Sequence, residues 1–304
     1  MLNAERYKNV YQILMSGKSS SKTPKAIVVS AMKGVTDDLI RCTEMAQQQN
    51  EAYKKLLTQI HDRHINEASS LLTDKNLKDS LLAVFKNDFD ELSEILRGVW
   101  LVKNASERIV ELISGCGEVW SAQILNAYFQ QMGLPSNWID ARKILVVSHS
   151  DRRVLVNWEK SKQKLDEWLQ LNSSCQFIAI TGFVAALEEG TITTLGRNGS
   201  DYSASIFGAL FDCDEIFIWT DVDGILSADP RLVPEAVILD EMSYNEVTEL
   251  AYFGAKVVHP STMAPAIAKQ IPIWIRNSLN STCPGTKIFN EAKSNRPVKG
   301  FSTI

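Results

Sequence analysis

Residues 176–230 place a glycine-rich turn between two segments with the character of buried strands. The runs Phe177–Ile180 and Ile216–Trp219 are short, apolar and rich in β-branched and aromatic residues, which is typical of buried strands. Between them lies Gly196–Asp201, followed by a helical apolar pattern. Because ligands bind outside the carboxyl ends of strands in open α/β sheets, this order predicts a binding crevice.

The residues in this stretch favour an anionic, phosphorylated ligand. Glycines allow the backbone to approach a ligand closely, and a helix N-terminus offers unpaired N–H groups to an anion. Arg197 lies inside the glycine turn, where a guanidinium can clamp a carboxylate or phosphate. Each charged residue also has a purely structural explanation. Asp201 and Glu118 could interact favourably with the helix dipole in the first turn of a helix. Lys256 could be an ordinary surface lysine, and Arg231 could simply pair with Asp229.

Composition excludes several classes of protein. The chain has 304 residues, is 45% hydrophobic and carries a net charge of −4, so we expect a globular protein without nucleic acid as its partner. No apolar run approaches a membrane span, and the N-terminus does not read as a signal peptide. The five cysteines lack CxxC spacing, which favours free thiols in the cytoplasm and no metal site. His61 and His64 share a helix face, where we expect them to be solvated.

The order of elements predicts an α/β protein. A buried strand at Ala26–Ser30 leads into a helix that Thr36 should cap, and the region of about residues 44–111 reads as a helical insertion. Ser243 and Glu246 have the spacing of a capping box. There is no GxxxxGK[ST] or GxGxxG motif, so the standard phosphate-binding loops are absent.

Several long motifs, in order, resemble the aspartate kinases of the amino acid kinase family. They are VVSAMKGVTD, SGCGEVWSA, TLGRNGSDYSA, WTDVDGILSADPR, MSYNEVTELAYFGAKVVHPSTM and IRNSLNSTCPGTKI. The resemblance covers nearly the whole chain. It implies a three-layer αβα sandwich with a mainly parallel central sheet. It also implies an amino-acid-binding lobe at residues 1–190, a nucleotide-binding lobe at 191–292, and a tail at 293–304 that begins a regulatory domain.

The activity implied by the resemblance is transfer of the ATP γ-phosphoryl group to the β-carboxylate of L-aspartate, the first step towards lysine, threonine and methionine. The implied roles fall into three groups. Aspartate would be held by Thr36, Glu118, Arg197 and Ser200. ATP would be held by Ser30, Gly182, Thr220, Asp221, Leu226, Arg231 and Lys256, where Leu226 replaces a tyrosine common in the family. Asp201 and Lys256 would be catalytic.

The chemistry is consistent with these residue types. A β-carboxylate with a pKa of about 3.9 is ionised at neutral pH, so the nucleophile needs no general base. The difficulty is to bring an anion to a polyanion, which calls for positive charge around the γ-phosphate, from Mg²⁺, lysine and backbone N–H groups.

Two departures from the family pattern concern the ends of the chain. Aspartate kinases begin with a Lys-Phe-Gly-Gly-Thr-Ser strand, which this chain lacks, and VKGFSTI matches only the start of the regulatory ACT domains. We therefore expect weak or no activity and no end-product inhibition. The chain would be either a catalytic fragment of a longer, bifunctional fusion protein or an unregulated form, and we expect a homodimer.

Two alternatives stay open from the sequence. One is another acyl-phosphate-forming kinase of the same family, for glutamate or acetylglutamate, although Glu118 and Arg197 favour a free α-amino acid. The other is a catalytically silent, ligand-binding subunit, which would bind nucleotide or aspartate without turnover.

Overall fold

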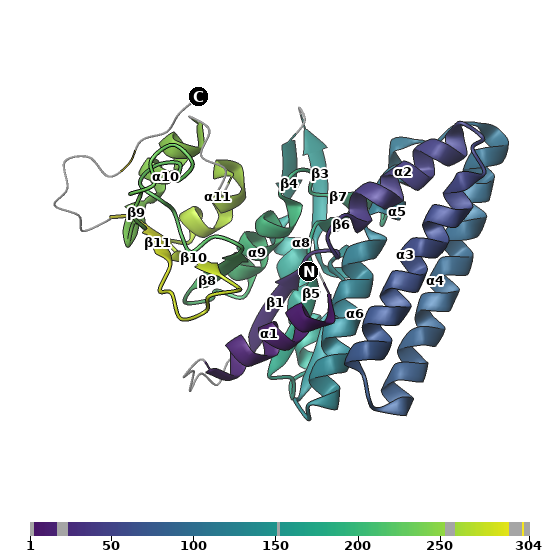
Figure 1. The fold of residues 1–304 in the computed structure, drawn as a ribbon, viewed down its shortest axis with the longest axis horizontal. Coiled ribbons are helices and arrows are strands. Elements are labelled where there is room, and N and C mark those ends of the chain that lie inside the picture. The colour runs from purple at the N-terminus through teal and green to yellow at the C-terminus, as the bar shows by residue number, and fades with distance from the viewer. Residues whose placement is uncertain (1–2, 17–23, 151–152, 253–258, 292–299, 301–304) are drawn as a thin grey trace. The chain divides into compact units, whose positions relative to one another are not determined.

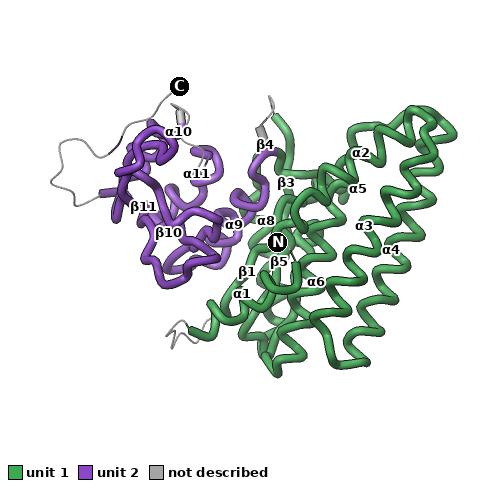
Figure 2. The backbone as a smooth tube through the Cα atoms, viewed as in Figure 1, with its two compact units in different colours: residues 1–196 green, residues 197–304 purple. Residues whose placement is uncertain are grey.

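The computed structural model describes residues 3–16, 24–150, 153–252, 259–291 and 300 (Figure 1). The chain divides into two compact units, residues 1–196 and residues 197–304 (Figure 2). Each unit contains its own β-sheet structure and its own buried apolar residues.

Unit 1 contains two sheets among its described residues. In the first, β5 (Phe177–Thr181) lies between β1 (Lys25–Val29) and β2 (Ser136–Ile139), and both pairings are parallel. Every residue of β5 is buried, which explains its unbroken apolar run. The second sheet has the order β4-β3-β6-β7 and comprises β3 (Val146–Ser150), β4 (Arg153–Val156), β6 (Val184–Leu187) and β7 (Ile192–Thr194).

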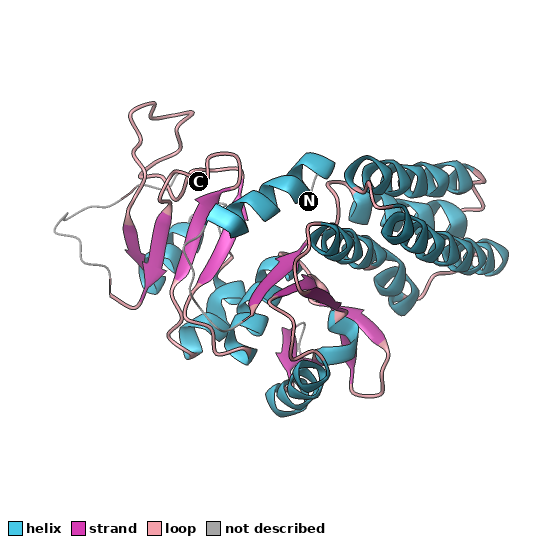
Figure 3. Ribbon diagram, turned by 90° about the horizontal axis from the view of Figure 1, so that it is seen from below, coloured by secondary structure: helices cyan, strands magenta, loops and turns pink. Residues whose placement is uncertain are grey.

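Helices lie on both sides of the unit 1 strands (Figure 3). The helix α8 (Trp158–Leu171) is fastened to the second sheet, because the Val146 N–H donates to Ser161 Oγ at 3.0 Å. The other helices of unit 1 are α1 (Ala4–Ser16), α2 (Val35–Gln47), α3 (Ala52–Leu71), α4 (Lys75–Val102), α5 (Glu107–Ser114), α6 (Cys116–Gln131) and the short α7 (Ala141–Ile144).

The region of about residues 44–111 is helical, as the sequence indicates, and contains α3, α4 and most of α5. Its apolar residues join one core with those of α2 and α6, which makes the insertion part of the main core of unit 1. The expectation that His64 is solvated is wrong. It is only 1% exposed, and its ring packs edge-on against Phe85 and Trp120.

Unit 2 is built on the sheet β8-β10-β11-β9. The strands are β8 (Ile216–Thr220), β9 (Glu241–Ser243), β10 (Ile273–Asn277) and β11 (Thr286–Phe289), and the helices are α9 (Gly199–Leu210), α10 (Tyr244–Tyr252) and α11 (Pro260–Ala268). The predicted capping box is confirmed: the Ser243 N–H donates to Glu246 Oε2 at 2.6 Å, and the Glu246 N–H donates to Ser243 Oγ at 3.2 Å.

The predicted fold class is confirmed, since helices cover sheets whose strand pairings are mostly parallel. The strands predicted near Ala26, Phe177 and Ile216 are all present, and apolar runs near Trp138, Val154, Ile273 and Ile288 also form strands. Four further strands, β3, β6, β7 and β9, were not predicted from sequence. None of the helices within the described ranges combines the length and the apolar character that crossing a membrane requires.

A paired substitution in α4 tests whether the insertion is part of the core. Phe85 is 1% exposed and its neighbour Val84 is 41% exposed. We expect Phe85→Ala to lower the free energy of unfolding by about 3–5 kcal/mol, because it leaves a cavity beside His64 and Trp120. Val84→Ala, measured by the same chemical denaturation, should change it by less than about 0.5 kcal/mol. Equal effects would show that the insertion does not pack as described.

Candidate active site

Ser30 and Gly182 meet at the carboxyl edge of the first sheet. They directly follow the parallel neighbours β1 and β5, and the Gly182 N–H donates to the Val29 carbonyl oxygen at 2.9 Å. Ser30 is exposed, so its hydroxyl is accessible at this edge. The structure thus brings these two predicted site residues together.

Glu118 brings a buried carboxylate to the same edge. It lies in the first turn of α6 and is 4% exposed. One carboxylate interaction is with the N–H of Ala31, the residue after Ser30, while Oε2 has no hydrogen-bond partner among the described residues. Burial raises the pKa of Glu118 to about 7, against the lowering effect of the backbone hydrogen bonds. This carboxylate therefore changes charge near neutral pH.

A glycine makes this arrangement possible. A Cβ on Gly117 would lie 2.8 Å from both Ala31 Cβ and Val35 Cγ1, so α6 can approach the turn after β1 only because residue 117 has no side chain. The same approach brings the first turn of α2, which carries Thr36, towards Glu118. The expectation that Thr36 caps this helix is wrong. The helix begins at Val35, and its N-cap is Gly34 with a φ of 84°.

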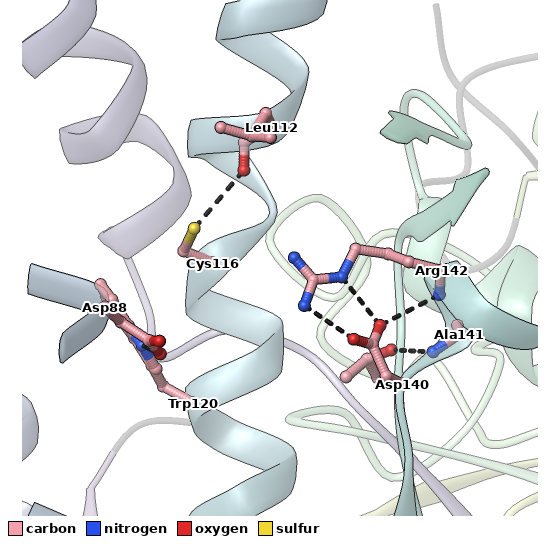
Figure 4. A network of polar contacts seen from close by, with 8 residues as sticks. Asp88, Leu112, Cys116, Trp120, Asp140, Ala141 and Arg142 are labelled. Carbon is pink, nitrogen blue, oxygen red and sulfur yellow. Dashed lines mark hydrogen bonds and ion pairs between the residues drawn. The ribbon is translucent and has the colours of Figure 1, made fainter. Parts of the chain in front are cut away.

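Asp140 and Arg142 add an ion pair at the neighbouring strand end, which was not predicted. Asp140 follows β2, and its carboxylate accepts from Arg142 Nε at 2.8 Å and from Nη2 at 2.7 Å (Figure 4). The adjoining Ala141 N–H donates to Thr181 Oγ1 at 2.8 Å, which ties the ends of β2 and β5 together. The sequence signal was available, since an acid and a base two residues apart follow the apolar pair Trp138-Ile139.

Phe183 is a second feature that the sequence reasoning missed. Its φ of 66° lies in the left-handed region, which is unusual for a bulky residue. It sits between β5 and β6, and its carbonyl oxygen accepts from the Leu195 N–H at 2.7 Å. Strained residues of this kind concentrate at functional sites, and this one adjoins Gly182.

In unit 2, Arg197, Ser200 and Asp201 surround the start of α9. The N-cap residue Asn198 has a φ of 56°, and Arg197 before it is exposed. Arg197 makes no ion pair with any residue in the described ranges. Asp201 is in the first helical turn, and burial raises its pKa. An unpaired guanidinium beside a helix N-terminus is suited to an anion.

Thr220 and Asp221 lie at the same end of unit 2 as the start of α9. A Cβ on Gly208, near the end of α9, would lie 2.6 Å from Ile216 Cδ1 at the start of β8. A tight turn joins the two elements, so they run in opposite directions and the start of α9 lies towards the end of β8. The start of α9 and the Thr220-Asp221 turn therefore lie towards one edge of unit 2.

The other three residues predicted to bind ATP have no common environment in the structure. Arg231 is exposed and binds Asp229 in a forked ion pair, with Nη2 2.6 Å from Oδ2, which lowers the pKa of Asp229 to about 2. Leu226 forms an isolated antiparallel bridge with Ile238. Lys256 lies outside the described residues.

No group of three or more His, Cys, Asp or Glu side chains suited to a metal ion occurs where the structure is described.

Comparison with known proteins agrees with this architecture. The family model described as "Amino acid kinase family" matches residues 1–277. The chain belongs to the amino acid kinase family.

Relatives within the family carry aspartokinase names. "Bifunctional aspartokinase/homoserine dehydrogenase 2, chloroplastic" of Arabidopsis thaliana is 40% identical over 99% of this chain and 33% of its own length. "Aspartokinase 1, chloroplastic" of the same plant is 31% identical over 94% of this chain and 50% of its own length. The chain thus spans about a third of the length of the bifunctional plant relatives it matches.

A solved structure shows the same fold. Escherichia coli aspartokinase III in complex with aspartate and ADP has a TM-score of 0.84 and is 24% identical, over 98% of this chain and 64% of that chain.

The buried Glu118 generates a prediction about stability and pH. Its pKa is raised from 4.5 to about 7 on folding, so the native state binds more protons between these values and stability must fall as pH rises. We expect Glu118→Gln to remove this loss. The variant should gain free energy of unfolding over the wild type between about pH 4.5 and pH 7, by at most roughly 3 kcal/mol.

Chemical denaturation at a series of pH values measures the difference. The matched control is Glu44→Gln at an exposed position of α2, which should show no such trend. A difference between Glu118→Gln and the wild type that does not change with pH would contradict a raised pKa for Glu118.

Proposed function

We propose that this chain is an aspartate kinase, which transfers the γ-phosphoryl group of ATP to the β-carboxylate of L-aspartate. The observation that carries the proposal is the buried carboxylate of Glu118, whose Oε2 has no partner among the described residues. A buried carboxylate oxygen without a partner is costly and calls for a cationic donor. The α-ammonium group of a free amino acid supplies one. The names of the curated relatives support aspartate as that amino acid.

The substrate would be held by the two charged groups on its Cα atom, which leaves the β-carboxylate free to react. Glu118 would meet the ammonium group, Arg197 would clamp the α-carboxylate, and Thr36 and Ser200 would supply hydroxyl groups. Arg197 is suited to its role because it is exposed and has no ion-pair partner in the described part of the chain. An N-acylated amino acid has no ammonium group, so it would leave Glu118 without a partner.

ATP would lie at the edge of unit 2 formed by the glycine turn and the Thr220-Asp221 turn, with Arg231 and Lys256 as further cations and Leu226 beside the nucleotide. Ser30 and Gly182 would line the phosphate path. Asp221 is exposed and therefore accessible to a ligand. With no cluster of three metal-ligating side chains in the described ranges, Mg²⁺ would be held mainly by phosphate oxygens and water, with Asp221 as the accessible carboxylate.

The protein's part in the reaction is positioning and charge. The β-carboxylate is ionised at neutral pH, so no side chain has to remove a proton from it. Bound Mg²⁺ would neutralise charge on the phosphates. Arg197 would orient the nucleophile, and Asp201, in the first turn of α9, would orient the cationic groups around the transferred phosphoryl group.

The names of the relatives also bear on the protein partners of this chain. The plant relatives join aspartokinase to homoserine dehydrogenase in one polypeptide, which supports a bifunctional fusion as the setting of this chain. A homodimer and a cytoplasmic location belong to the proposal as well.

Acyl phosphate formation is the direct test. The chain is incubated with L-aspartate and MgATP, and the product is trapped with hydroxylamine as the hydroxamate. We expect turnover with L-aspartate and none with acetylglutamate. Arg197→Ala should lower kcat/KM for aspartate about thirtyfold or more, because it removes a charged partner of the α-carboxylate. Arg41→Ala, on the exposed side of α2, is the matched control.

A second protein, in which a Lys-Phe-Gly-Gly-Thr-Ser strand precedes the chain, is assayed in parallel. Turnover in either protein supports the kinase. Aspartate binding without turnover in both would favour a silent ligand-binding subunit, and preference for glutamate or acetylglutamate would assign another member of the family.

Proton release provides a separate test of the role of Glu118. At pH 6, below its pKa of about 7, this carboxyl group is mostly protonated before the ligand binds. Pairing with an ammonium group favours the ionised form, so binding of L-aspartate should release up to one proton. Calorimetric titrations in buffers of different ionisation enthalpy measure this number. It should fall to near zero in Glu118→Gln, and equal release from both proteins would remove Glu118 from the ammonium site.

A further inference from the structure

The turn that follows β8 is fastened to the loop that follows β10. These strands are parallel neighbours with Thr220 opposite Asn277, so their carboxyl ends lie side by side. The Thr220 carbonyl oxygen accepts from the Ser278 N–H at 2.9 Å and from Ser278 Oγ at 3.1 Å. The turn is therefore held at its first residue by the segment after β10.

Asn277 holds the centre of the turn. Its side chain is buried, at 8% exposure, and its Nδ2 donates to Asp223 Oδ1 at 2.8 Å and to the Asp221 carbonyl oxygen at 3.4 Å. Its Oδ1 accepts from the Leu279 N–H at 2.8 Å, which fixes the orientation of the amide. Asn280 adds a second donor to Asp223 Oδ1, at 3.1 Å.

The last part of the turn is held by β11. The Ile225 N–H donates to Thr286 Oγ1 at 2.8 Å. A Cβ on Gly224 would lie 2.7 Å from that same oxygen, so only glycine allows this approach.

These contacts place the two carboxylates of the Asp221-Val222-Asp223 turn in different environments. Asp223 accepts two side-chain amide hydrogen bonds and is half-buried. Asp221 is exposed, and its carboxylate accepts a hydrogen bond from Thr220 Oγ1 at 3.2 Å within the turn itself. The first acid is thus presented outward while the second is fixed inward.

We propose that Asn277, acting through Asp223, is a positioning residue that sets the nucleotide affinity of the Thr220-Asp221 turn. This inference rests on the proposed function, which assigns that turn to ATP. The side chain of Asn277 acts on the turn backbone and on Asp223, so its effect should fall on nucleotide binding and leave aspartate binding unchanged.

Exchanging the amide of Asn277 and the carboxylate of Asp223 tests whether the two residues act together. Asn277→Asp sets one carboxylate against another and should raise the KM for ATP and the Kd for MgADP about tenfold or more. Asp223→Asn keeps an oxygen for Asn277 and Asn280 and should have a smaller effect. The double variant Asn277→Asp/Asp223→Asn reverses the hydrogen bond, since the new amide donates to the new carboxylate. It should recover most of the lost affinity while the KM for aspartate stays within about twofold in all variants.

Calorimetry with MgADP, the hydroxylamine assay and chemical denaturation are run on every variant. Asn290→Asp, at an exposed position of unit 2, is the matched charge control and should bind MgADP as the wild type does. If wild-type protein is active and the double variant does not recover, or if both KM values rise together, the inference is wrong and the proposed function stands. If wild-type protein binds no nucleotide, the assignment of the turn to ATP fails and the inference fails with it.

Discussion

The close approach of α6 to the turn after β1 is the contact on which the unit 1 site depends. With glycine at position 117, the helix start can lie against Ala31 and Val35, and the Ala31 N–H reaches the carboxylate of Glu118. That approach also buries Glu118 and raises its pKa. A packing constraint at one glycine thus determines the orientation of a carboxylate and the pH range in which it is charged. The close packing at Gly117 therefore accounts for both the position of the Glu118 carboxylate and its raised pKa.

In unit 2 the positions of polar side chains depend on the parallel register of β8 and β10. Because Thr220 and Asn277 are opposite each other, the first residues of the two loops that follow are close enough to exchange hydrogen bonds. The sheet supplies rigidity, and the loops supply the groups that meet a ligand. A shift of register by one residue would turn Asn277 to the other face of the sheet and remove its bond to Asp223.

Sequence reasoning succeeded where a signal is local and failed where it is not. The apolar run at Phe177–Ile180 is enough to predict a buried strand, and Ser243 with Glu246 is enough to predict a cap. The strands β7 and β9 have three residues each, which is too few for a pattern. Pairing orders them: β7 forms a hairpin with β6, and β9 pairs with the distant strand β11. Thr36 was given the capping role because its side chain suits it, whereas a left-handed Gly34 takes that place.

The candidate site residues also divide into those that a local sequence signal indicates and those that depend on distant contacts. The resemblance pointed to Glu118, but its burial depends on a tertiary contact that no spacing reveals. Asn277 was not predicted as a site residue, because its partner Asp223 is 54 positions away along the chain.

The ion pair between Asp229 and Arg231 has a consequence for ligand choice. An arginine held by a carboxylate two residues away is oriented but already neutralised. Asp229 binds Nε and Nη2 of this guanidinium, so a further anion would meet an arginine whose charge is largely balanced. In the proposed ATP site, a singly charged anion would gain little from Arg231, whereas a polyphosphate would gain more because it carries several charges.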